Sequence, residues 1–142
     1  MADHGINVSR ADTAVATPNA ATCGIPFVIG TAPLSKATGT AATAGTPVLC
    51  TSYTEAEEQL GYDNDWAKFT VCEVMYYHFK LCACQPVIFL PLAENAEAEA
   101  VAAAVEQVEA CLTMFGIVPD LIMAPGFSKE ATVAAALAAK AG

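Results

Sequence analysis

Basic residues are scarce in this chain. Only six of its 142 residues are Lys or Arg, against 15 Asp and Glu, and the formal net charge is −9. Because proteins bind the phosphates of nucleic acid mainly through Lys and Arg, this balance argues against nucleic acid as a partner. Charged residues make up only 15% of the chain and hydrophobic residues 55%. So few charges indicate that neighbouring molecules cover part of the apolar surface.

Long apolar runs are also missing. Residues 1–20 are polar and contain acids, so they lack the apolar centre of a secretory signal peptide. Apolar runs elsewhere fall far short of the roughly 20 residues that a membrane-spanning helix needs. We therefore expect no membrane insertion, and we expect the six cysteines to be thiols in a reducing cytoplasm.

Residues that commonly carry catalysis are few. A nucleophilic Cys or Ser needs a base, and only His4 and His78 could supply an imidazole. The chain has no G-x-G-x-x-G or G-K-[ST] motif for phosphate. An anion could dock at residues 124–128, before a helix, but only Lys129 would support it, so a plain turn is the simpler interpretation. We expect no catalytic residues and no enzyme.

Cys82 and Cys84 form the most suggestive pair for a metal. Two thiolates could hold a soft metal, but tetrahedral zinc needs four ligands, and no second pair stands at a suitable spacing. Cysteine also serves as a small buried apolar side chain, and we favour that role for all six. The chain is therefore predicted to hold no metal and no cofactor.

Three aromatic residues, Trp66, Tyr76 and Tyr77, could line a cage for a ligand. Aromatic side chains bury large areas in cores and interfaces. Packing is therefore the simpler interpretation of this group.

Short apolar segments alternate with helical patterns along the chain. Strands are expected at residues 25–31, 47–51, 86–92 and 121–124. Helices are expected at residues 52–61, 66–81, 95–114 and 129–139, with Ser52 and Ser128 as N-caps and Gly61 as a left-handed C-cap. One helical face is expected to be buried through Val101, Val105, Val108, Leu112 and Phe115. This order predicts an α/β layered sandwich, with a mainly parallel sheet of about four strands flanked by helices.

Residues 1–22 differ from the predicted core domain at residues 23–142, because they are rich in Ala, Thr, Asp and Asn. One short stretch alternates as a strand does, with Ile6 and Val8 on one face. The stretch consists of Gly5, Ile6, Asn7, Val8, Ser9 and Arg10. It is either a frayed terminus or an extended arm that adds a strand to another subunit's sheet.

Residues 61–92 resemble the sheath proteins of contractile tails, from phages and related injection machines. That family shows a G-Y-x-x-D-W-x-K-[FY]-T turn, a C-E-x-M-Y helix and a P-V-x-F strand. The matching residues here are Gly61-Tyr62, Asp65-Trp66, Lys68-Phe69-Thr70, Cys72-Glu73-Val74-Met75-Tyr76 and Pro86-Val87-Ile88-Phe89. The likeness also covers residues 24–33, 46–53 and 115–128, in the family's order.

The sequence departs from the family at two points. The family usually inserts a β-rich domain after the P-V-x-F strand, whereas residues 91–95 here lead directly into a helix. The family also continues into a C-terminal domain beyond the point that matches Gly142. The resemblance is therefore to the N-terminal and core portion.

The resemblance implies a structural protein of a virion tail or contractile injection particle, assembled in the bacterial cytoplasm. Identical subunits would stack in rings around an inner tail tube protein, link through exchanged arm strands and drive contraction. The residues themselves leave two alternatives open. One is a small-molecule-binding or enzymatic flavodoxin-like domain, and the other is an α/β subunit of a non-contractile filament.

Overall fold

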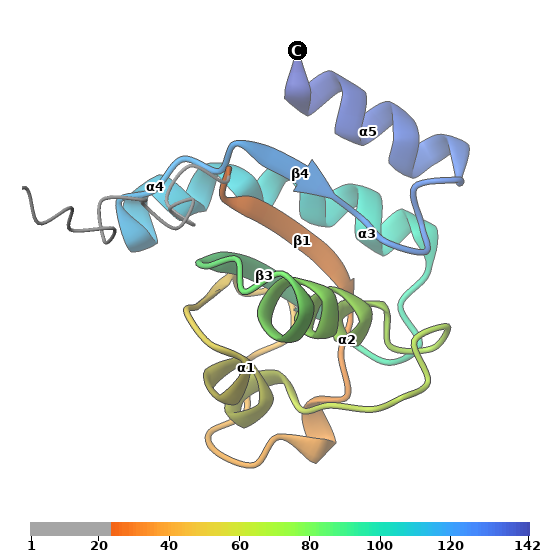
Figure 1. Ribbon diagram of the computed structural model, residues 1–142. Coiled ribbons are helices and arrows are strands. Elements are labelled where there is room, and N and C mark those ends of the chain that lie inside the picture. The colour runs from red at the N-terminus through yellow and green to blue at the C-terminus, as the bar shows by residue number, and fades with distance from the viewer. Residues whose placement is uncertain (1–23) are drawn as a thin grey trace, which may run out of the picture.

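A mixed four-stranded sheet forms the centre of the computed structural model, which describes residues 24–142 (Figure 1). Its strand order is β2-β3-β1-β4. Strand β1 pairs in parallel with β3 and β4, and β2 runs antiparallel to β3. The strands are β1 (Pro26–Thr31), β2 (Val48–Cys50), β3 (Val87–Leu92) and β4 (Leu121–Met123). The predicted α/β fold with a mainly parallel sheet is confirmed for this part of the chain, whereas the arm at residues 5–10 lies outside it.

Helices cover both faces of the sheet (Figure 1). On one side lie α1 (Tyr53–Leu60), α2 (Thr70–Met75) and the π-helix η4 (Tyr76–Leu81), with a short 3₁₀ turn η3 (Leu34–Lys36) after β1. On the other side lie α3 (Ala98–Ala104), the 3₁₀ segment η5 (Val105–Glu109), α4 (Ala110–Phe115) and α5 (Ala131–Ala141).

The two central strands divide their side chains between two cores. Every residue of β1 and β3 is buried. Because successive side chains point to opposite faces, Phe27 and Leu90 join the core under α3 and α5, whereas Val28 and Phe89 join the core under α1 and α2. This explains why β3 along its whole length and β1 as far as Gly30 lack the polar alternation of a half-buried strand.

Ser52 begins α1 as its sequence predicts. Its hydroxyl accepts a hydrogen bond from the Glu55 amide at 3.2 Å, while the Glu55 carboxylate reaches back to the amide of Thr51 at 2.8 Å. Gly61 ends the helix with a positive φ of 75°, which favours glycine, but its ψ of 172° lies outside the left-handed helical region, so the expected left-handed cap is wrong. A Cβ on Gly61 would stand 2.3 Å from the carbonyl oxygen of Pro33, so close packing also requires glycine.

Two predicted helix starts are wrong. The helix expected from residue 66 begins at Thr70, because the Asp65 carbonyl and carboxylate bind the amides of Phe69 and Lys68 and hold a turn there. Ser128 does not cap α5. Its amide bonds to the carbonyl of Ala124 within a turn, and α5 begins after Glu130 without a side-chain cap.

The helical face expected from Val101 to Phe115 is interrupted at Leu112. Leu112 is 58% exposed, and its neighbour Cys111 is fully buried instead. The five residues of η5 form a 3₁₀ segment. A 3₁₀ helix advances about 20° more per residue than an α-helix, so η5 turns the buried face by about one residue position. Leu112 is thereby turned outward.

Candidate functional site

The carboxyl ends of the parallel strands are the place where an open α/β sheet usually binds a ligand. Here the start of α2 fills that place. The Thr31 amide donates to the Thr70 hydroxyl and the Thr70 amide donates to the Thr31 hydroxyl, each at 3.2 Å. Both threonines are at most 4% exposed.

Two glycines bring the backbone close to Thr70 at this end of the sheet. A Cβ on Gly30 would lie 2.3 Å from the Thr70 hydroxyl oxygen, and a Cβ on Gly126 would lie 2.7 Å from its methyl carbon. A Cβ at either glycine would therefore clash with Thr70, which shows how closely the backbone packs against this side chain. Protein atoms thus fill the space where a flavodoxin-like domain would hold its ligand. The arrangement disfavours the small-molecule alternative at this position.

Three described cysteines are fully buried. Burial raises the pKa of the Cys50 thiol to about 12 and that of Cys72 to about 11, and it also raises the pKa of Cys111. A thiol that stays protonated is a poor nucleophile and a poor metal ligand. The packing role predicted for these three side chains fits this chemistry.

Cys82 and Cys84 lie in the turn after η4, where Cys82 is exposed and Cys84 half-buried. Nearby, Nδ1 of His78 is buried without a hydrogen-bond partner, and burial lowers the pKa of this imidazole. Within residues 24–142, no three His, Cys, Asp or Glu side chains gather as a metal site would require.

The predicted aromatic group does come together. The Trp66 ring lies 5.5 Å from Tyr76 and 5.7 Å from Tyr77, and its indole N–H donates to the Tyr62 hydroxyl at 3.2 Å. The Lys80 ammonium lies 4.0 Å from the centre of the Tyr53 ring. The same ammonium lies 5.9 Å from the centre of the Tyr76 ring, so a cation of the same chain stands beside one ring of this group.

Exposed large apolar side chains concentrate on the α4 and β4 side of the molecule. Leu112 and Met114 project from α4, Val118 from the following loop and Leu121 from β4, with exposed fractions of 58%, 48%, 66% and 51%. Single exposed leucines are ordinary, but several in one stretch of 10 residues mark a candidate contact surface.

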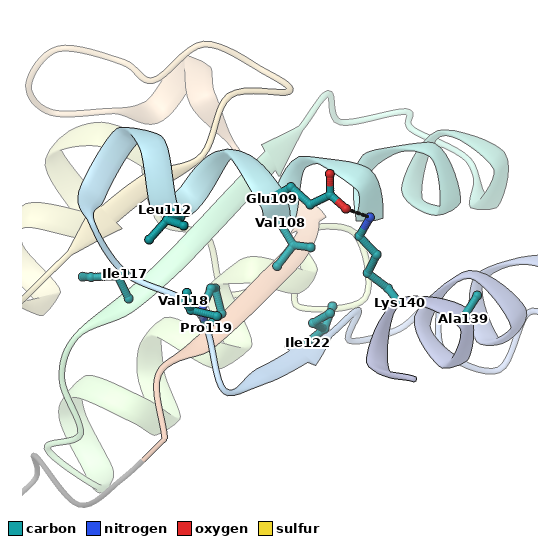
Figure 2. Close-up of a pocket in the computed structure, with 9 residues that line it drawn as sticks. All are labelled: Val108, Glu109, Leu112, Ile117, Val118, Pro119, Ile122, Ala139 and Lys140. Atoms are coloured by element: carbon teal, nitrogen blue, oxygen red, sulfur yellow. Dashed lines mark hydrogen bonds and ion pairs between the residues drawn. The ribbon is translucent and has the colours of Figure 1, made fainter.

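A groove of about 580 Å³ adjoins these residues. Figure 2 shows its lining side chains directed toward a common space between α4, the loop before β4 and the end of α5. Apolar residues form most of the wall, including Leu112, Ile117 and Ile122. At the rim, the Lys140 ammonium binds the Glu109 carboxylate at 2.5 Å and Glu106 at 2.7 Å.

Strand β4 stands at the edge of the sheet next to this groove. The Leu121 amide bonds to the Ile25 carbonyl of the neighbouring chain segment. Because alternate residues of a parallel strand bond to opposite sides, the amide and carbonyl of Ile122 face the outer edge. In residues 24–142, β4 has β1 as its one strand neighbour. We call the β4 edge together with the groove the β4 surface.

The sequence signal for this surface was present but misleading. The residue spacing predicts a buried position for Leu112, and the 3₁₀ segment η5 accounts for its exposure. The arm residues Gly5, Ile6, Asn7, Val8, Ser9 and Arg10 lie outside the described residues.

No helix in the described residues is long and apolar enough to cross a bilayer. Comparisons of the chain with models of protein families, with curated proteins and with solved structures found no match.

Proposed function

We propose that this protein is a structural subunit of a contractile tail sheath or a related injection machine, and that it acts by assembly rather than by catalysis. The observation that carries the proposal is the β4 surface, where an apolar groove adjoins a strand edge that no other strand of residues 24–142 pairs with. Edge strands invite strand addition, and exposed apolar patches are typical of protein interfaces. The motif order that resembles sheath proteins supports the same assignment.

The proposed mechanism is mechanical. Identical subunits stack around an inner tube protein, and the arm at residues 5–10 links neighbours through backbone hydrogen bonds. Contraction repacks the α/β cores into a lattice with more buried apolar area, while the linked strands hold the subunits together. The scarcity of Lys and Arg agrees with a partner surface of protein rather than nucleic acid. No cofactor takes part in this scheme.

Electron microscopy of the purified full chain across a range of concentrations tests the proposal. Rings or hollow tubes are expected. Thin fibres without a central channel would instead support the non-contractile filament. A strict monomer at every concentration would contradict both assembly functions.

One observation favours a second function. The groove of about 580 Å³ falls within the size range of small-molecule pockets. However, the loop residues 117–119 that line it lead into the amino end of β4, opposite the end where such sheets usually bind ligands. Native mass spectrometry of the purified chain would reveal a retained small molecule if this alternative held.

A further inference from the structure

We propose that Cys82 and Cys84 form a thiol–disulfide exchange site, at which a small disulfide oxidises the two thiols to a disulfide bond between them. The site lies in the turn between η4 and β3 and goes beyond the proposed function, on which it does not depend. In a reducing compartment the dithiol is the resting form and the disulfide is transient, as is usual for redox-active cysteines.

Exposure separates this pair from the other cysteines of residues 24–142. Cys50, Cys72 and Cys111 are fully buried. Cys82 is exposed and Cys84 is half-buried. Exchange requires a thiol that a small reagent can reach, and the thiolate is the reactive form. Cys82 is therefore the residue that meets the small disulfide, and Cys84 follows two residues later to complete the exchange.

The backbone between the two cysteines is bent into a tight turn. Ala83 has a φ of 50°, and within the described residues it is the one non-glycine residue with a positive φ. Alanine does not favour this left-handed conformation, so the surrounding fold imposes it. A left-handed residue turns the chain as tightly as a helical one, which places the Cα atoms on either side about 5.4 Å apart. This separation falls within the range of about 4.4–6.8 Å that disulfides span.

Backbone hydrogen bonds hold the turn against the end of η4. The Cys82 amide donates to the Tyr77 carbonyl at 2.9 Å, and the Cys84 amide donates to the His78 carbonyl at 2.7 Å. The Sγ atom of Cys84 lies 3.7 Å from the Cys82 carbonyl oxygen, so this side chain folds back toward the other cysteine. Because both backbones are anchored, rotation of the side chains can bring the two sulfur atoms together.

The exchange consumes one small disulfide in two steps. The Cys82 thiolate attacks one sulfur of the small disulfide, forms a mixed disulfide and releases one small thiolate. The Cys84 thiolate then attacks the Cys82 sulfur, closes the bond between the two cysteines and releases the second small thiolate. The protons of the two cysteine thiols pass through water to the released thiolates. The dithiol is thereby oxidised by two electrons, and the small disulfide is reduced to two thiols.

Mass spectrometry of the full-length chain in glutathione redox buffers tests the site, with oxidised glutathione as the small disulfide. Cys23 lies outside the described residues, so wild type and Cys23→Ser are both measured. Acid quenching, followed by denaturation and alkylation, marks the thiols that remain reduced. Both chains are expected to lose two hydrogen atoms, with the new bond mapped to Cys82 and Cys84. The three buried cysteines should stay reduced.

Variants of the Cys23→Ser chain separate the two steps. Cys84→Ser keeps the exposed thiol but lacks the second step, so it should accumulate a mixed disulfide that adds the mass of one glutathione at Cys82. Cys82→Ser lacks the exposed thiol, so its reaction with glutathione disulfide should be at least about tenfold slower.

Two substitutions at Ala83 test the turn itself. Ala83→Gly is the matched control, because glycine accepts a positive φ and should leave ring closure intact. Ala83→Pro fixes φ at about −65°, so the equilibrium constant for ring closure should fall at least about tenfold. Circular dichroism checks that each variant is folded.

Three outcomes would overturn the inference. The first is a disulfide between Cys84 and Cys23 in wild type, or no disulfide in the Cys23→Ser chain. The second is a Cys84→Ser chain that fails to accumulate the mixed disulfide. The third is equal ring closure in Ala83→Gly and Ala83→Pro. These measurements do not depend on assembly, so their failure would leave the sheath role standing, and a chain without rings or tubes would leave the exchange site standing.

Discussion

Helices α1 and α2 close one face of the sheet with large side chains, whereas α4 and α5 leave the other face partly open. The closed face buries Leu60, Val71 and Met75 against Phe89. On the open face, α5 is mainly alanine and contributes Val133 as its one fully buried side chain. Small side chains cannot fill the space above α4 and β4, so a groove remains. The size of the covering side chains therefore decides which face can receive a partner.

The largest expected loss of stability follows from a substitution in the core of the closed face. Phe89→Ala should lower the free energy of unfolding by about 3–5 kcal/mol, because the side chain is fully buried and leaves a cavity. Phe27 is equally buried on the open face, where looser helices can collapse into the space, so Phe27→Ala should cost less. Urea denaturation of both variants measures the difference, and an equal or larger loss at Phe27 would contradict the comparison.

The Thr31–Thr70 pair tests how the carboxyl ends of the strands are closed. Thr70→Val removes the hydroxyl that accepts from the buried Thr31 amide, so we expect a loss of about 1–3 kcal/mol. The exposed Thr46 is a matched control, and Thr46→Val should change stability little. If both substitutions shift the denaturation midpoint equally, the Thr31–Thr70 hydrogen bonds do not contribute to stability.

Raising the pH above 9 should lower the free energy of unfolding through Cys50, a buried residue of the closed face. The pKa of Cys50 rises from its ordinary value of 9.0 to about 12 on folding, so the unfolded chain loses this proton first. The free energy of unfolding should therefore fall between pH 9 and 12, by at most about 1.4 kcal/mol per pH unit for this group. Cys50→Ala should flatten the decline, whereas the exposed Cys82→Ala should not. Equal slopes in both variants would refute this assignment.

Filling the groove should produce the smallest change in stability. Ala139 lines the groove, and a leucine there buries more apolar surface, so Ala139→Leu should gain less than about 1 kcal/mol. It should also weaken self-association, because it fills part of the groove that the proposed function assigns to contact between subunits. Ala135→Leu, on an exposed part of α5 outside the groove lining, is the control. Association that is equally strong in both variants would argue against the groove as a contact.

The sequence predicted the sheet well because its signals are local. Continuous apolar runs identified β1 and β3, and the Ser52 cap identified α1. It could not predict that Thr70 rather than Trp66 begins the next helix, because besides the local turn at Asp65 the start is held by a hydrogen bond from the Thr70 amide to the distant Thr31 hydroxyl. The β4 surface was missed for a similar reason. A 3₁₀ segment rotates Leu112 outward, and residue spacing alone does not reveal where a helix changes its pitch.

Hydrogen exchange at the Ile122 amide tests the central claim most directly, because this amide faces the outer edge of β4. In the full-length chain, we expect its exchange to slow as protein concentration rises, while the amides of β1 keep their protection. The Val8→Asp chain should show fast exchange at Ile122 at every concentration. Exchange at Ile122 that is independent of concentration in an associating wild-type chain would contradict the claim that the β4 surface binds another copy.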